Sequence, residues 1–234
     1  GDIEILPPEK TWKIDFLKRQ ETGDPYWPKM ERPTYVAACV RTSEIGDPRN
    51  EPFKARLQAK IAAAKKAADF TVVLPHVGGQ FNPAPGDYAR HTVGWMAESG
   101  ADLVVGTHPH TSQRCEIFPN GVPAAYSLGN FAFTPYVGWY IHGQLAEYSA
   151  VLHAYLDPKT KKLAKLTFTV VKSVVGTDGV SRTYPVKDLH ERLADDDARQ
   201  FLRMENEAMV NRFRGGSSAV DVEDEYVIWT CPGR

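Results

Sequence analysis

The sequence has few cysteines, no long apolar run and almost no net charge. Its three cysteines, Cys39, Cys115 and Cys231, are far apart and form no CxxC pair, so neither a disulfide framework nor a cysteine-ligated zinc knuckle is expected. We find no signal peptide and no apolar run long enough to span a bilayer, and we expect no membrane segment in this chain. The expected location is therefore cytoplasmic, or extracytoplasmic if a signal or anchor precedes this sequence.

Charge and composition narrow the class of protein. The formal net charge of -1 argues against a nucleic-acid-binding protein, which would carry a basic face. Apolar residues make up 42% and charged residues 24% of the 234 residues, as in ordinary globular domains. We expect a loop-rich segment over 1–33, a main domain over 34–186, and a helical extension with a tail over 187–234.

Two short apolar runs, Phe70–Leu74 and Ala101–Val105, have the length and β-branched content of strands, and the sequence between them predicts a helix from 86 to 99. Such a βαβ unit has parallel strands and a right-handed crossover. His76 and His108 follow the two strands, so both are expected at the carboxyl edge of the sheet, where open α/β sheets bind ligands.

A third histidine, His110, lies two residues after His108. Pro109 disfavours the α region for His108 and predicts extended backbone there, in which residues i and i+2 point the same way. His76, His108 and His110 are therefore predicted to converge, and three neutral imidazoles are a ligand set for a transition metal. The predicted cofactor is a divalent ion of zinc, manganese, iron or cobalt.

The remaining elements follow from local patterns. Thr34–Val40 is a strand candidate, and Asn50 is expected to cap a helix that runs from Glu51 to about Ala68. Asn120-Gly121 predicts a hairpin between strands at 112–118 and 123–127. Antiparallel strands are expected at 147–156 and 163–175, and a helix capped within 195–197 should reach Arg214. The predicted fold class is α/β, with flanking helices, antiparallel strands and a helix towards the carboxyl terminus.

Several motifs stand in one order along the chain: His-Val-Gly at 76–78, Gly-Ala-Asp-Leu-Val-Val-Gly-Thr-His-Pro-His at 100–110, Gln113 with Glu116, and Tyr-Ser-Leu-Gly-Asn-Phe at 126–131. In this order and spacing they resemble the CapA/PgsA capsule-biosynthesis family. That family is a branch of the calcineurin-like metallophosphoesterases, and the resemblance covers about 35 to 133. Val77 and Gln80 stand where the family has a tryptophan and a carboxylate. The family's amino-terminal Gly-Asp and Asn-Asn-His motifs are absent. Either an amino-terminal polypeptide segment is the partner that completes the site, or the protein has lost half of its site.

The resemblance implies a metal-dependent, hydrolase-like enzyme that acts on a peptide or polyglutamate-type substrate. Two alternatives stay open: a metal-dependent peptide epimerase that transfers a Cα proton, and a non-catalytic subunit of a capsule-polymer assembly. His76, His142 and Asn130 are the catalytic candidates, and Asn130 is alternatively a turn former. The candidates for substrate contact are the cations Arg90 and Arg114 and the aromatic residues Phe133 and Trp139.

Overall fold

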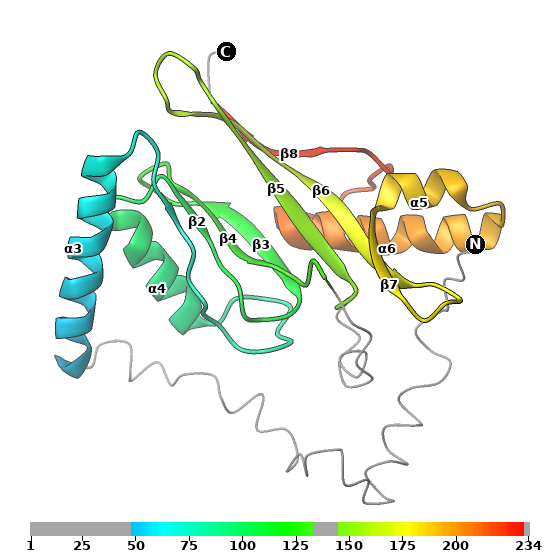
Figure 1. The fold of residues 1–234 in the computed structure, drawn as a ribbon, viewed down its shortest axis with the longest axis horizontal. Helices are drawn as coiled ribbons and strands as arrows, with labels where there is room; N and C mark the ends of the chain where they lie inside the picture. Colours follow the sequence, from blue (N-terminus) through cyan, green and yellow to red (C-terminus); the bar gives the residue numbers. More distant parts are fainter. Residues whose placement is uncertain (1–47, 133–144, 232–234) are drawn as a thin grey trace, which may run out of the picture.

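A computed structural model of the chain describes residues 48–132 and 145–231 (Figure 1). The predicted strand Thr34–Val40 and the segment 1–33 lie outside these residues. So do three of the candidate site residues, His142, Phe133 and Trp139. Within the described residues, no helix is both long and apolar enough to cross a membrane.

The first sheet contains the predicted βαβ unit. Its order is β1-β2-β4-β3, formed by β1 (Val72–Val73), β2 (Leu103–Val105), β4 (Pro123–Leu128) and β3 (Ser112–Ile117). The first three strands of this order are parallel, and β3 pairs with β4 as an antiparallel hairpin. The parallel pairing of β1 with β2 and the hairpin are both confirmed, although β1 is shorter than the run Phe70–Leu74.

Two helices lie beside this sheet, on the left in Figure 1. They are α3 (Glu51–Ala67), which follows a 3-10 turn (Pro48–Asn50), and α4 (Asp87–Glu98), which connects β1 to β2. Ile61 of α3 and Val93 of α4 belong to one buried cluster with Val104 of β2, so both helices cover the same face of the sheet. Asn50 is the residue before α3, which begins at Glu51 as predicted, but it does not cap the helix through its side chain. Asn50 ends the 3-10 turn in helical backbone geometry, and its side chain makes no capping hydrogen bond.

The second sheet is antiparallel, as the alternating pattern predicted. Its long strand β6 (Leu163–Val175) pairs with β5 (Tyr148–Leu156) along one edge. On its other edge, β6 pairs with β7 (Ser181–Pro185) and β8 (Tyr226–Thr230). An isolated bridge between Gly129 and Ser149 connects the end of the first sheet to the start of the second.

The helix α6 (Asp196–Arg214) packs against both sheets and follows the short helix α5 (Val186–Arg192). Asp195 caps α6 by accepting a hydrogen bond from the backbone N–H of Ala198, as expected for an aspartate in this place. Leu202, Met209 and Phe213 of α6 are buried in one cluster with residues of β2, β3, β5 and β6. This shared core fixes the sheet edge that carries the histidines against the second sheet.

Candidate functional site

The two histidine-bearing loops are joined by backbone hydrogen bonds just beyond β1 and β2. The N–H of Thr107 donates to the carbonyl oxygen of Pro75 at 2.9 Å, and the N–H of Val77 donates to that of Thr107 at 3.0 Å. A parallel bridge therefore pairs His76 with Thr107. The pairing of the parallel strands thus continues into the loops and brings both histidines to the carboxyl edge of the sheet.

His76 and His108 are in direct contact. The Nε2 atom of His76 lies 2.9 Å from the Nδ1 atom of His108, and the ring centroids are 4.5 Å apart. Two nitrogens at this distance share one proton or one bound ion, because two facing lone pairs repel each other. Burial, together with the neighbouring His76 and His110, lowers the pKa of His108, which favours the neutral ring with its lone pair.

Thr107 contacts Nδ1 of His76, the ring nitrogen that does not face His108. The hydroxyl of Thr107 donates to the carbonyl oxygen of Pro75 at 3.4 Å, and its oxygen lies 3.2 Å from Nδ1 of His76. When the hydroxyl donates to Pro75, its oxygen can accept from Nδ1–H of His76. The lone pair of this ring is then on Nε2, which is the nitrogen directed at His108.

The backbone of the His108–His110 segment differs from the prediction. His108 has φ 111° and His110 has φ 58°, so the segment is a bend with two left-handed residues and not an extended chain. The expectation that alternate residues of an extended chain would align the two rings is wrong. The rings are nevertheless neighbours, with centroids 6.2 Å apart. Non-glycine residues at positive φ are strained, and such strain concentrates at functional sites.

Asn130 sets the orientation and tautomer of His110. Its side-chain NH₂ donates to the carbonyl oxygens of His110, at 2.7 Å, and of Ala146, at 3.1 Å. The amide oxygen must therefore be the atom 2.8 Å from Nδ1 of His110, and it accepts that nitrogen's proton. This leaves the lone pair of His110 on Nε2. A hydrogen bond of this kind is how metal-ligating histidines are usually oriented.

Gly129 explains how Asn130 reaches this position. Its φ is 85°, and a Cβ atom placed on it would lie 2.8 Å from the carbonyl oxygen of Tyr148. Only glycine allows β4 to turn at this point and approach β5 so closely. The side chain that follows is thereby directed between His110 and Ala146.

The histidine pair fits a transition metal. In a tetrahedral site with metal–nitrogen distances near 2.0–2.1 Å, two ligand nitrogens are roughly 3.3 Å apart, and the His76–His108 nitrogens at 2.9 Å are close to that separation. His110 does not join them here: in residues 48–132 and 145–231 no three His, Cys, Asp or Glu side chains are grouped as a metal site. The structure therefore brings two of the three predicted ligands together and keeps the third beside them.

A cavity of about 240 Å³ opens next to the pair. It lies between the histidines, the Gly78-Gly79 turn, Asn82 and the first turn of α4. No side chain caps the amino terminus of this helix, and its first turn, which lines the cavity, carries the partial positive charge of a helix start. The described lining includes no lysine or arginine.

Arg90 and Arg114, the two predicted substrate contacts, do not line this cavity. Arg114 pairs with Glu116, whose other carboxylate oxygen accepts from the hydroxyl of Tyr126 at 2.8 Å. Arg90 is exposed on α4, and its charge acts on Tyr126. The two arginines thus belong to the surroundings of Glu116 and Tyr126.

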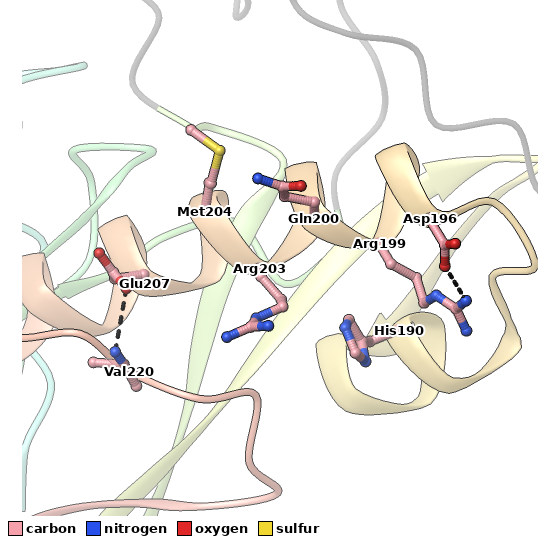
Figure 2. A pocket seen from close by; sticks show the side chains of 8 residues that line it. All are labelled: His190, Asp196, Arg199, Gln200, Arg203, Met204, Glu207 and Val220. Atoms are coloured by element: carbon pink, nitrogen blue, oxygen red, sulfur yellow. Dashed lines mark hydrogen bonds and ion pairs between the residues drawn. The ribbon is translucent and has the colours of Figure 1, made fainter.

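A larger hollow of about 660 Å³, which none of the three histidines lines, lies along α6 (Figure 2). Its charged side chains are locally compensated: Asp196 pairs with Arg199, Arg203 is 3.3 Å from Asp221, and Glu207 accepts from the N–H of Val220. It contains one histidine, His190, and the described residues form no group of three or more His, Cys, Asp or Glu side chains there. Among the described residues, the cavity at His76 and His108 is therefore the better candidate site.

A buried network of charged side chains adjoins the segment that binds Asn130. Lys172 of β6 donates to Glu205 of α6 at 2.8 Å and to the hydroxyl of Tyr148 at 2.7 Å, and is 3.7 Å from Glu147. Burial raises the pKa of Glu147, against the weaker opposing effect of Lys172. Glu147 follows Ala146, whose carbonyl oxygen binds Asn130, so the network holds the segment that positions Asn130.

Sequence reasoning missed the residues that form the cavity around the histidines. Asn82 and Asp87 to Ala89 belong to it, and Gln113 holds the first of these by donating to its carbonyl oxygen at 2.8 Å. The sequence did contain a signal for them. Gly86, where the predicted helix starts, comes ten residues after His76, and a helix that follows a strand begins at the carboxyl edge of the sheet, where His76 was expected.

Comparison with known proteins gives matches over part of the chain. A family profile described as "Bacterial capsule synthesis protein PGA_cap" matches residues 8–135. The chain is 43% identical over 79 residues to the "PGA biosynthesis protein CapA" of Bacillus subtilis (strain 168), which is 34% of this chain and 20% of that protein. It is 37% identical over 75 residues to the "Capsule biosynthesis protein CapA" of Bacillus anthracis, which is 32% of this chain and 18% of that protein. The aligned segment thus spans about a fifth of these relatives.

Proposed function

The chain belongs to the family of bacterial capsule synthesis proteins, and on this premise we propose that it is a metal-dependent enzyme acting on a peptide or polyglutamate-type substrate. In this proposal His76, His108 and His110 hold one divalent transition metal. The observation that carries it is the contact between Nε2 of His76 and Nδ1 of His108 at 2.9 Å, at the carboxyl edge of parallel strands.

The surrounding side chains prepare the histidines for this role. Thr107 holds the proton of His76 on Nδ1, and Asn130 does the same for His110, so both rings present Nε2 as a lone-pair donor. A bound divalent metal would supply activation of water or polarisation of a substrate carbonyl. The lowered pKa of His108 favours the neutral ring, which is the form that coordinates a metal.

The charge of the cavity favours an amide over a phosphate ester. Besides any metal, sites for phosphoryl transfer usually surround the anion with arginine or lysine, because charge is spread over several oxygens in the transition state. The described lining has no such cation, and it includes the carboxylate of Asp87. The uncapped amino terminus of α4 offers N–H groups that suit one carbonyl oxygen or one carboxylate of the substrate. The B. subtilis relative is named for PGA biosynthesis, which is in accord with this choice.

Two assays on the metal-loaded full chain test the proposal, completed where needed with the amino-terminal polypeptide of a relative. One follows amide cleavage and deuterium uptake at Cα in peptides and polyglutamate, and the other follows phosphate release from generic esters. We expect turnover of the amide substrates that His108→Ala removes. His91→Ala changes an exposed histidine of α4 and should retain the activity.

The other outcomes select other functions. Deuterium uptake without cleavage would identify a peptide epimerase. Phosphate release alone would identify a phosphoesterase. Metal binding with turnover of none of these substrates would support a non-catalytic subunit of a capsule-polymer assembly.

A further inference from the structure

The carbonyl oxygen of Phe131 is held by the second sheet. Phe131 directly follows Asn130, and the hydroxyl of Thr183 on β7 donates to its carbonyl oxygen at 2.6 Å. The hydroxyl of Ser173 on β6 lies 3.4 Å from the same oxygen. Phe131 is 62% exposed, so burial of its ring contributes little to holding the backbone in place. The chain that leaves β4 at this point is therefore held mainly by hydrogen bonds to its backbone.

Ser173 and Thr183 form one hydroxyl pair. They are direct partners in the antiparallel pairing of β6 with β7, and their side-chain oxygens are 2.9 Å apart. Hydrogen bonds between hydroxyl groups on opposite strands stabilise such pairs. When Thr183 donates to Phe131, its oxygen can accept from the hydroxyl of Ser173, which is buried. The bond from Ser173 thus orients the hydroxyl of Thr183 towards Phe131.

Ser173 also holds the second chain segment that binds Asn130. The side-chain NH₂ of Asn130 donates to the carbonyl oxygen of Ala146 at 3.1 Å. The next residue, Glu147, accepts at its carbonyl oxygen from the N–H of Ser173 at 2.9 Å. The amide of Asn130 therefore lies between two segments, one held by the hydroxyl of Thr183 and the other by the backbone of Ser173.

We propose that Thr183 is a positioning residue that acts through Asn130 on His110. Its hydroxyl fixes the backbone of Phe131, and this places the amide oxygen of Asn130 where it accepts from Nδ1 of His110 at 2.8 Å. Without the hydroxyl, the segment loses a short hydrogen bond and the amide is no longer held against the ring. The proton of His110 is then free to move to Nε2, the nitrogen that would bind a metal.

The tautomer of His110 in the metal-free full chain tests this role. Long-range ¹H–¹⁵N spectra of histidine-labelled protein, recorded at alkaline pH where imidazoles are neutral, show which ring nitrogen carries the proton. His110→Ala identifies the signals. We expect the proton on Nδ1 in the wild type and in Thr183→Ser, which retains the hydroxyl. Thr183→Val retains the branched shape without the hydroxyl, and it should shift the proton towards Nε2, as Asn130→Ala does.

Metal affinity, measured by competition with a chromophoric chelator, gives a second readout, which rests on the proposed function. Loss of a direct partner of a ligating histidine costs 10- to 100-fold, and Thr183 is one step further away, so we expect a loss of about three- to tenfold in Thr183→Val. Thr169→Val is the matched control, because it removes from β6 a hydroxyl that donates to the carbonyl oxygen of Asp224 at 2.7 Å. It should leave both the tautomer of His110 and the affinity unchanged.

Combination with Asn130→Ala separates positioning from a general loss of stability. Thr183→Val should weaken metal binding in the wild type but not in Asn130→Ala, because both changes then remove one interaction. Thr183→Ala takes the place of Thr183→Val if the latter does not fold. A wild-type tautomer in these variants, an equal shift in Thr169→Val, or an equal loss of affinity in both backgrounds would each overturn the proposal. If no variant binds metal, the proposed function fails, and the tautomer of His110 alone decides the role of Thr183.

Discussion

Asn130 accepts a hydrogen bond from Nδ1 of His110 while its own NH₂ group donates to the carbonyl oxygens of His110 and Ala146. One amide thus fixes both the orientation of a histidine ring and the nitrogen that carries its lone pair. The sequence motif places Asn130 two residues beyond β4, and the structure gives it a positioning task that does not require contact with a substrate.

Replacing Asn130 should weaken metal binding through His110. In Asn130→Ala the proton of His110 is free to move to Nε2, and loss of such a supporting hydrogen bond typically costs 10- to 100-fold in metal affinity. Asn130→Asp retains an acceptor for Nδ1–H and should bind metal more tightly than Asn130→Ala. Competition titration against a chromophoric chelator measures both. Equal affinities for the wild type and Asn130→Ala would show that this hydrogen bond does not support a ligand.

Gly106 should not tolerate even one methyl group. A Cβ atom there would lie 2.2 Å from the carbonyl oxygen of Tyr126, which is backbone and cannot move aside without breaking the pairing of β2 with β4. We expect Gly106→Ala to lower the free energy of unfolding by roughly 2–3 kcal/mol or more. Gly216→Ala is the matched control, because its Cβ would make an ordinary contact at 3.5 Å. Urea denaturation compares the two, and equal stabilities would contradict the close approach.

The buried lysine should be costly to remove alone. Lys172→Met leaves Glu205 buried without its cation, and breaking a buried pair from one side costs about 3–5 kcal/mol. The double variant Lys172→Met/Glu205→Leu removes both charges and should recover much of the loss. Chemical denaturation of the two variants and the wild type gives the comparison. A double variant as unstable as Lys172→Met would show that packing, and not charge, explains the effect.

The contribution of Glu147 to the free energy of unfolding should decrease as pH rises. Burial raises its pKa in the folded state above the ordinary value of 4.5, so the folded chain holds this proton more tightly than the unfolded chain does. The stabilisation is complete below pH 4.5 and is lost as pH rises through the higher, folded pKa. Glu147→Gln cannot titrate and should show a smaller decrease in unfolding free energy across this range. Identical pH profiles for the two proteins would contradict the assignment.

Local patterns predicted most of the fold because they reflect local physics. The β-branched runs before His76 and His108, the Asn120-Gly121 turn and the Asp195 cap each act within a few residues. The α/β class and the placement of both histidines at one sheet edge followed from them.

The predictions that failed, and the features that no pattern predicted, depend on the tertiary structure. Asn50 lies at the predicted cap position, but it ends a 3-10 turn and its side chain does not cap α3. His108 adopts φ 111° where a pattern argument for residues before proline favours extended backbone. The ion pair between Lys172 and Glu205 joins residues 33 positions apart that only the packing of α6 on β6 brings together. No period or motif signals such a pair.

Metal content of the purified full chain tests the central claim most directly. Elemental analysis after dialysis against metal-free buffer should find one equivalent of a transition metal in the wild type and in His91→Ala. His108→Ala and His110→Ala should each lose most of it, while circular dichroism shows that they stay folded. Unchanged metal content in both His108→Ala and His110→Ala would contradict the account, because the histidines at this sheet edge would then not be ligands.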